Sequence, residues 1–167
     1  MKKFEYILNG IFYQITWFLC IFYPDRFYAF IAAFLTVGLH LSFKSEKLRE
    51  LIIILIAGIC GYSMDQLMDY INILNTSAKS NSSLYLAIIW FVFACTLRSS
   101  FSFIFKTYVR AISLGVLAPA SYFFAQKIGV VKYSEPIIYS IAIHMFTYVS
   151  LMTFFYRMNM KIGADHE

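Results

Sequence analysis

Three charged residues lie inside long apolar segments of this chain, where a charge is costly. Asp65 and Asp69 lie one helical turn apart in one segment, and Arg98 lies in the next. A charged side chain at the centre of a membrane costs about 3 kcal/mol on insertion scales, and it usually faces the interior of a helix bundle or water. These three residues are therefore the first candidates for a functional site.

The candidate residues permit several kinds of chemistry, but none comes with a specific motif. The two carboxylates can act as an acid and a base or as a proton relay. A serine hydrolase can be drawn from Ser99 or Ser100 with His144 and Asp65, yet no nucleophile turn or oxyanion-hole glycine motif surrounds either serine. Metal binding by Asp65, Asp69 and His144 lacks a recognised spacing such as HExxH. The sequence therefore predicts no catalytic residue and favours a binding protein over an enzyme.

Cofactor, metal and nucleic-acid binding have no support in the sequence. No Walker A, GxGxxG or haem-attachment motif occurs. Cys20, Cys60 and Cys95 lie in separate apolar segments without CxxC spacing, which indicates neither a disulfide framework nor a zinc site. The net charge is +5, but the basic residues occur singly or in pairs rather than in the clustered patch that nucleic acid requires. We expect no cofactor, no metal and no nucleic-acid partner.

The elements that carry these residues are predicted from composition. The chain has 167 residues, of which 60% are hydrophobic, 20% aromatic and 14% charged, and its mean hydropathy is +0.68. A helix needs about 20 mostly apolar residues to span a membrane, and such segments with short connectors use nearly the whole chain. We predict an all-α integral membrane protein, with one membrane domain over residues 1–167 that is a compact bundle of six transmembrane helices. Their expected ranges are 4–23, 27–43, 51–74, 84–105, 109–126 and 136–156.

Lysine and arginine residues near the helix ends predict the orientation, because they gather on the cytoplasmic side of a membrane. Nine lie on the side of the N-terminus, namely Lys2, Lys3, Lys44, Lys47, Arg49, Lys106, Arg110, Arg157 and Lys161. Four lie on the other side, namely Arg26, Lys79, Lys127 and Lys132. We therefore expect cytoplasmic N- and C-termini in a bacterial inner membrane. The fifth segment is the weakest prediction, because Gly115 and Pro119 could break it.

Polar or small residues on each predicted helix recur three or four positions apart, so each helix has one such face. On the predicted topology Asp65 and His144 lie at similar depths, and the long side chain of Arg98 can reach Asp65. We expect these faces to meet inside the bundle. The predicted ligand-binding residues are Asp65, Asp69, Arg98, His144, Gln14 and Tyr122.

A purely structural interpretation of these residues stays open. A buried pair of Asp65 and Arg98 can fix the register of two helices without binding a ligand. Small and polar faces also allow close helix packing and hydrogen bonds between helices. His40, near the predicted cytoplasmic end of its helix, is expected at the membrane interface.

Several residues occur in an order that resembles a known family. The order is Asn9, Gln14, Trp17, Cys20, His40, Asp65, Ile89-Trp90, Phe93-Ala94-Cys95-Thr96-Leu97, Ser100, Gly115, Ala118-Pro119-Ala120-Ser121-Tyr122 and Gly129. Over nearly the whole chain it resembles the bacterial inner-membrane family catalogued as domain of unknown function 2878. This resemblance implies a compact multi-pass membrane protein and no established activity. The chain departs from the family at Ala118, where glycine is usual, and at Arg98, where a small polar residue is usual, so an Asp65–Arg98 pair is not expected throughout the family.

Three functions are compatible with these observations. The leading hypothesis is an accessory protein that binds or presents a lipid or another small amphipathic molecule at the polar cluster. The first alternative is a small transporter, or the substrate-binding membrane subunit of one, in which Gly115 and Pro119 break a helix at the site. The second is a membrane scaffold that recruits partner enzymes. Membrane lipids, a small amphipathic ligand and a membrane-protein partner are the expected partners.

Overall fold

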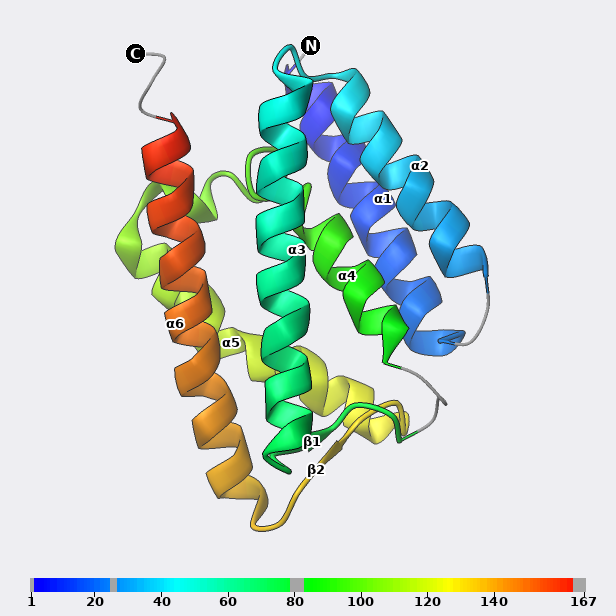
Figure 1. Ribbon diagram of the computed structural model, residues 1–167, viewed down its shortest axis with the longest axis vertical. Coiled ribbons are helices and arrows are strands. Elements are labelled where there is room, and N and C mark those ends of the chain that lie inside the picture. Colours follow the sequence, from blue (N-terminus) through cyan, green and yellow to red (C-terminus); the bar gives the residue numbers. More distant parts are fainter. Residues whose placement is uncertain (1, 25–26, 79–82, 164–167) are drawn as a thin grey trace. The chain divides into compact units, whose positions relative to one another are not determined.

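Six α-helices account for most of the computed structural model, which describes residues 2–24, 27–78 and 83–163 (Figure 1). They are α1 (Lys2–Phe22), α2 (Tyr28–Ser42), α3 (Lys47–Tyr70), α4 (Leu84–Ala94), α5 (Tyr108–Lys127) and α6 (Ile137–Gly163). A 3-10 helix, η1 (Ile104–Lys106), precedes α5, and strand β1 (Leu74–Asn75) pairs with antiparallel strand β2 (Lys132–Tyr133). The prediction of a helical chain with six helices is confirmed for the described residues. Arg26 and Lys79, two of the four outer charges, lie outside those residues.

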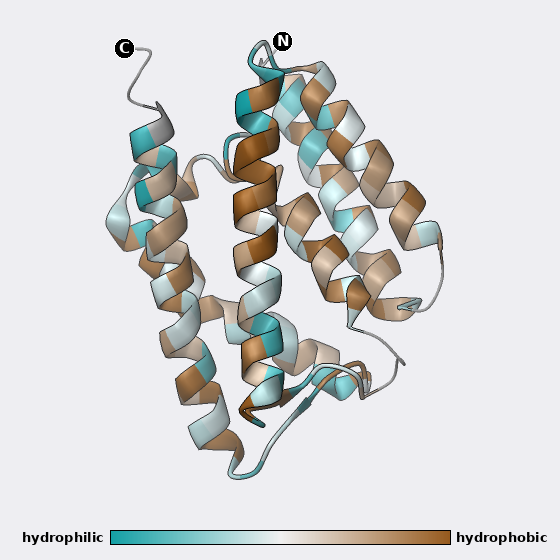
Figure 2. Cartoon of the chain, viewed as in Figure 1, coloured by the Kyte–Doolittle hydropathy of each residue, from teal (hydrophilic) through white to brown (hydrophobic). Residues whose placement is uncertain are grey.

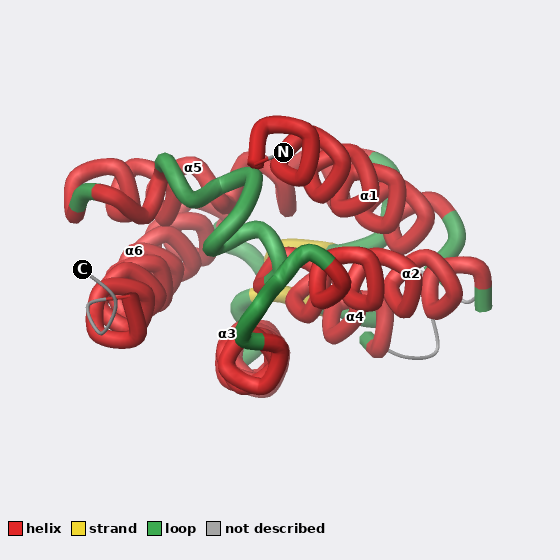
Figure 3. Tube along the Cα trace, turned by 90° about the horizontal axis from the view of Figure 1, so that it is seen from above, coloured by secondary structure: helices red, strands yellow, loops and turns green. Residues whose placement is uncertain are grey.

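The elements fall into two compact units, each described by itself. The first unit comprises Met1–Ser63 and Ser80–Phe101, and the second comprises Met64–Lys79 and Ser102–Glu167. In the first, α1, α2 and α4 pack against one another. In the second, α5 packs along α6 (Figures 1 and 3), and β2, which connects these two helices, pairs with β1. α3 contributes its first part to one unit and its last part to the other.

Within the described part of the chain, three helical segments are long and apolar enough to cross a membrane, namely α3, α5 and residues Ile137–Lys161 of α6. Figure 2 shows the pattern along α3, which is hydrophilic near both ends and hydrophobic in the middle. α2 and α4 are also apolar, but they have only 15 and 11 residues. The length and composition of these helices are those of a membrane protein.

The fourth helix is shorter than predicted. α4 ends at Ala94, and residues 95–103 form successive turns rather than the helix expected over 84–105. The reason lies in the hydroxyl side chains, because Thr96 Oγ1 donates to the Phe93 carbonyl at 2.6 Å and Ser99 Oγ donates to the Cys95 carbonyl at 2.6 Å. Such side chains compete with backbone amides for carbonyl groups and disfavour a regular helix.

The fifth segment behaves in the opposite way, since α5 is continuous from Tyr108 to Lys127 with Pro119 inside it. In Figure 1 its ribbon changes direction along its length. Proline removes one backbone donor and bends a helix without necessarily ending it. The broken helix of this chain is therefore the fourth segment and not the fifth.

The third helix also ends earlier than predicted, at Tyr70 instead of residue 74. Asn72 adopts a left-handed conformation with φ of 56°. The Asn72 amide donates to the Asp69 carbonyl and the Ile73 amide to the Met68 carbonyl, both at 2.9 Å. This pair of bonds satisfies the last carbonyls of a helix, and asparagine tolerates the left-handed position. Asp69 therefore lies in the last turn of α3 and not deep in a longer helix.

We expect Gly115→Ala to destabilise the second unit by about 1 to 3 kcal/mol, the usual cost of overpacking. An added Cβ atom at Gly115 would lie 2.6 Å from the Val149 Cα atom and 2.9 Å from the Tyr148 carbonyl oxygen. Backbone atoms cannot rotate away, so α5 and α6 would have to separate. Gly38→Ala is the matched control, because nothing lies within 4 Å of its added Cβ atom. Thermal unfolding in detergent checks this, and equal midpoints for the two variants would contradict it.

Candidate functional site

A buried carboxylate in the second unit is held by two tyrosines from two other helices. Asp65 of α3 has no exposed surface. The Tyr148 hydroxyl of α6 donates to its Oδ1 atom at 2.6 Å, and the Tyr122 hydroxyl of α5 lies 2.9 Å from Oδ1 and 2.8 Å from Oδ2. The two tyrosine hydroxyls also contact each other. Asp65, Tyr122 and Tyr148 are called the Asp65 triad below.

His144 packs directly against this triad. Its ring centroid lies 4.6 Å from that of Tyr122 and 4.4 Å from that of Tyr148, at interplanar angles of 81° and 78°. Nδ1 is hydrogen-bonded to the Tyr133 hydroxyl at 2.5 Å. Nε2 is buried and has no hydrogen-bond partner among the described residues. A buried polar atom without a partner costs about 1 to 3 kcal/mol, and a position that carries this cost is a functional candidate.

Tyr133 connects the buried residues to the loop before α6. It lies on β2 opposite Leu74 of β1, and its amide donates to the Gln126 Oε1 atom at 2.8 Å. Burial raises the pKa of the Tyr133 phenol above its ordinary value. Tyr133 therefore keeps its proton at neutral pH. Its hydroxyl group can donate a hydrogen bond to His144 Nδ1 or accept one from it, depending on the histidine tautomer.

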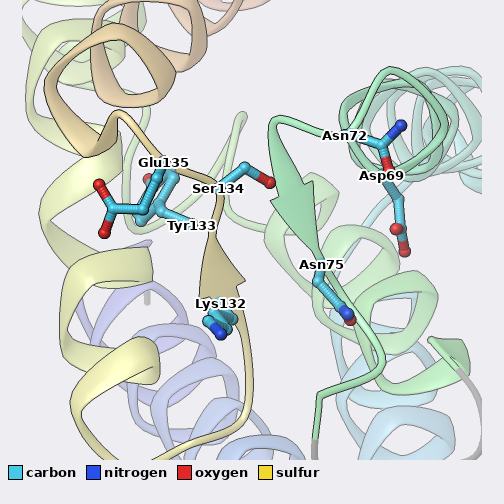
Figure 4. A pocket seen from close by; sticks show the side chains of 7 residues that line it. All are labelled: Asp69, Asn72, Asn75, Lys132, Tyr133, Ser134 and Glu135. Carbon is cyan, nitrogen blue, oxygen red and sulfur yellow. The ribbon is translucent and has the colours of Figure 1, made fainter.

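A polar pocket of about 330 Å³ opens beside Tyr133 (Figure 4). It is lined by Asp69, Asn72, Asn75, Lys132, Tyr133, Ser134 and Glu135. One side comes from the end of α3 and the segment that follows it, and the other from β2 and the residues before α6. The lining combines carboxylates, carboxamides and an ammonium group, so it offers both donors and acceptors to a polar ligand. Tyr133 belongs both to this lining and to the hydrogen bond with His144.

The first unit contains a second polar network, centred on Glu50. This carboxylate is 6% exposed. His40 Nε2 lies 3.2 Å from Glu50 Oε2, and Arg98 Nη1 forms an ion pair with Glu50 Oε1 at 3.0 Å, without the alignment of a hydrogen bond. His40 is 2% exposed, so its ring is buried within the protein. Its helix packs against α1 and α4, which bury the ring.

Asn9 of α1 joins this network to the irregular segment after α4. Its Oδ1 atom accepts hydrogen bonds from Ser99 at 2.7 Å and Ser100 at 2.8 Å. Its Nδ2 atom donates to the Cys95 carbonyl at 3.4 Å and lies 3.4 Å from His40 Nδ1. Ser99 is thus bonded to a carboxamide and a carbonyl, and neither is the base that a nucleophilic serine needs.

Three of the six predicted ligand-binding residues come together. Asp65, Tyr122 and His144 form the buried cluster of the second unit, while Asp69 of the same unit lines the pocket. The Asp69 carboxylate accepts a hydrogen bond from the Thr76 amide at 3.2 Å and contacts the Thr76 hydroxyl.

The other two predicted residues belong to the first unit. Arg98 has Glu50 as its carboxylate partner there, whereas the sequence suggested Asp65. Gln14 is exposed on α1. Among the described residues, no three His, Cys, Asp or Glu side chains are placed to hold a metal ion together.

Sequence reasoning missed Tyr148 and Tyr133. Tyr148 follows His144 by four residues, so helical periodicity places both on one face of α6, and this signal was available. Tyr133 gave no such signal, because it lies in a short segment between helices and reaches His144 through the pairing of two-residue strands.

Comparison with known proteins identifies the family. A family profile described as "Protein of unknown function (DUF2878)" matches residues 6–154, which include the Asp65 triad, His144 and the Glu50 network. Neither the curated proteins nor the solved structures yield a match. The match confirms the resemblance seen in the sequence and covers most of the chain. This protein therefore belongs to the DUF2878 family of proteins of unknown function.

Proposed function

We propose that this protein binds the polar part of a lipid or another amphipathic molecule at the pocket of the second unit. The observation that carries the proposal is the position of the pocket. It lies where α3 ends and just before α6 begins, at the ends of two helices that are long and apolar enough to cross a membrane. Helix ends of this kind lie at the level of lipid headgroups.

The chemistry of the pocket fits a headgroup that carries both charges. The Lys132 ammonium group suits a phosphate or carboxylate, while Asp69 and Glu135 suit an ammonium group. A volume of about 330 Å³ is at the small end of ligand pockets, as a headgroup requires. Tyr70 directly follows Asp69, and Ile138 lies three residues after Glu135; both are exposed and offer an apolar rim for the rest of the molecule.

The proposal includes six spans with cytoplasmic termini in a bacterial inner membrane. Exposed apolar side chains on α1 support it, since Phe4, Ile7, Ile11 and Ile15 form a stripe along one face. The turns after α4 are compatible with membrane depth, because irregular backbone is tolerated there when it is buried in protein. In this orientation the pocket faces the periplasm.

Binding experiments with defined ligands test the proposal. We expect phosphatidylethanolamine to bind the purified protein in detergent, and Lys132→Gln to weaken binding about tenfold or more, because a charge-assisted hydrogen bond contributes about 1.5 to 3 kcal/mol. Lys127→Gln is the matched control, since it removes an exposed lysine of the same unit that does not line the pocket. Soluble phosphoethanolamine separates recognition of a free headgroup from recognition of a whole lipid. Equal binding by both variants would contradict the proposed site.

A second candidate function is transport, which the interruption of α4 favours. Transporters bind substrates at discontinuous helices whose carbonyl groups are free to accept other bonds. Here the Cys95 carbonyl accepts from Asn9 and Ser99 instead of a regular helical amide. Movement of fluorescent phosphatidylethanolamine between the leaflets of proteoliposomes tests this candidate, and rates equal to those of protein-free vesicles would argue against it.

A further inference from the structure

The Asp65 triad contains more contacts than an ionised carboxylate and two phenols can supply with hydrogen atoms. Its three groups contact one another pairwise, as Tyr122 with Asp65, Tyr148 with Asp65 and Tyr122 with Tyr148. Each contact between two oxygen atoms at hydrogen-bond distance needs one hydrogen, and each phenol has one. An ionised Asp65 adds none, so one of the three contacts would lack a hydrogen.

One added proton completes the arrangement. With Asp65 protonated, its carboxyl group donates from Oδ2 to Tyr122, Tyr122 donates to Tyr148, and Tyr148 donates to Oδ1. The three bonds then form a closed ring in which every contact has its hydrogen. We infer that the Asp65 triad is a proton-binding site that holds this proton at neutral pH.

Titratable groups from each neighbouring element face the triad. Tyr122 comes from α5, Tyr148 and His144 from α6, and Tyr133 from β2. Asp69 lies one turn further along α3, at the pocket. The inference goes beyond the proposed function, because proton binding requires no ligand in the pocket and is measured without one. A failure to bind lipid therefore leaves it standing, and its own failure leaves lipid binding standing.

Infrared difference spectroscopy of the full protein in lipid nanodiscs tests the site. We expect a carbonyl band of a buried, protonated carboxyl group at neutral pH. The band disappears in Asp65→Asn, whose carboxamide has nearly the same shape, and persists in Asp69→Asn. In Tyr148→Phe the band moves to higher frequency, because the carboxyl oxygen loses a donor. A band that is absent from the wild type, or that neither Asp65→Asn nor Tyr148→Phe changes, overturns the site.

Discussion

Replacing Glu50 by glutamine is expected to lower the free energy of unfolding by about 3 to 5 kcal/mol, the usual cost of removing one partner from a buried ion pair. Glu50 is 6% exposed and contacts both Arg98 and His40. The neutral side chain keeps the shape of glutamate but leaves the Arg98 guanidinium without its carboxylate. The remaining charge is only 25% exposed, so water compensates it poorly.

Glu46→Gln provides the control for this prediction. Glu46 also accepts from an arginine, Arg49, at 2.8 Å, but its side chain is 43% exposed. An exposed ion pair contributes about 0 to 1 kcal/mol, so this variant is expected to stay close to the wild type. Unfolding in detergent, followed by circular dichroism, measures both. Losses of equal size would show that burial does not determine the strength of the Glu50 network.

The Glu50 network also shows where prediction from the sequence ends. The sequence indicated that Arg98 needs a carboxylate partner, and the depth argument suggested Asp65. Glu50 was part of a charged connector between predicted helices, because hydropathy separates charged residues from helices. α3 begins at Lys47, however, so Glu50 lies in the first turn of a helix and is buried against Arg98 and His40.

The number and order of helices could be predicted because each lies in an apolar segment of the sequence, and hydropathy detects such segments. The end of α4 could not be predicted, because it depends on hydrogen bonds from threonine and serine hydroxyl groups, and these residues also occur inside regular membrane helices. In the sequence, Thr96 and Ser99 have no feature that distinguishes them from residues inside a helix. Only the structure shows which carbonyl groups their hydroxyls bind. The sequence therefore pointed to a break in the fifth segment, whereas the structure has the break in the fourth and a continuous helix in the fifth.

The buried cluster was predicted in part, because the energetic cost of Asp65 marks it in any sequence. His144 and Tyr122 followed from helical periodicity and expected depth. The link to the pocket did not follow, because it depends on Tyr133 pairing with Leu74 across two strands of two residues each. Strands this short have no periodicity that a sequence pattern can detect.

The largest coupled effect is expected within the Asp65 triad. Asp65→Leu removes the acceptor of two hydroxyl groups, and each buried polar group that loses its partner costs about 1 to 3 kcal/mol. The double variant Tyr122→Phe/Tyr148→Phe removes both hydroxyl partners of the Asp65 side chain, which has no exposed surface, and it is expected to cost several kcal/mol as well. Unfolding in detergent measures both losses.

The triple variant Asp65→Leu/Tyr122→Phe/Tyr148→Phe is expected to recover most of the lost stability. Replacing every member of a buried polar cluster by apolar residues of similar size often changes the free energy of unfolding little. Removing only one member lowers it, because the remaining polar groups stay buried without partners. Losses that simply add in the triple variant would contradict this coupling. Recovery has a consequence for function, because a triad that an apolar core can replace is not needed for stability. Its polar groups would then be explained by proton binding. The triple variant is expected to fold, and its infrared spectrum is expected to lack the band of the buried carboxyl group.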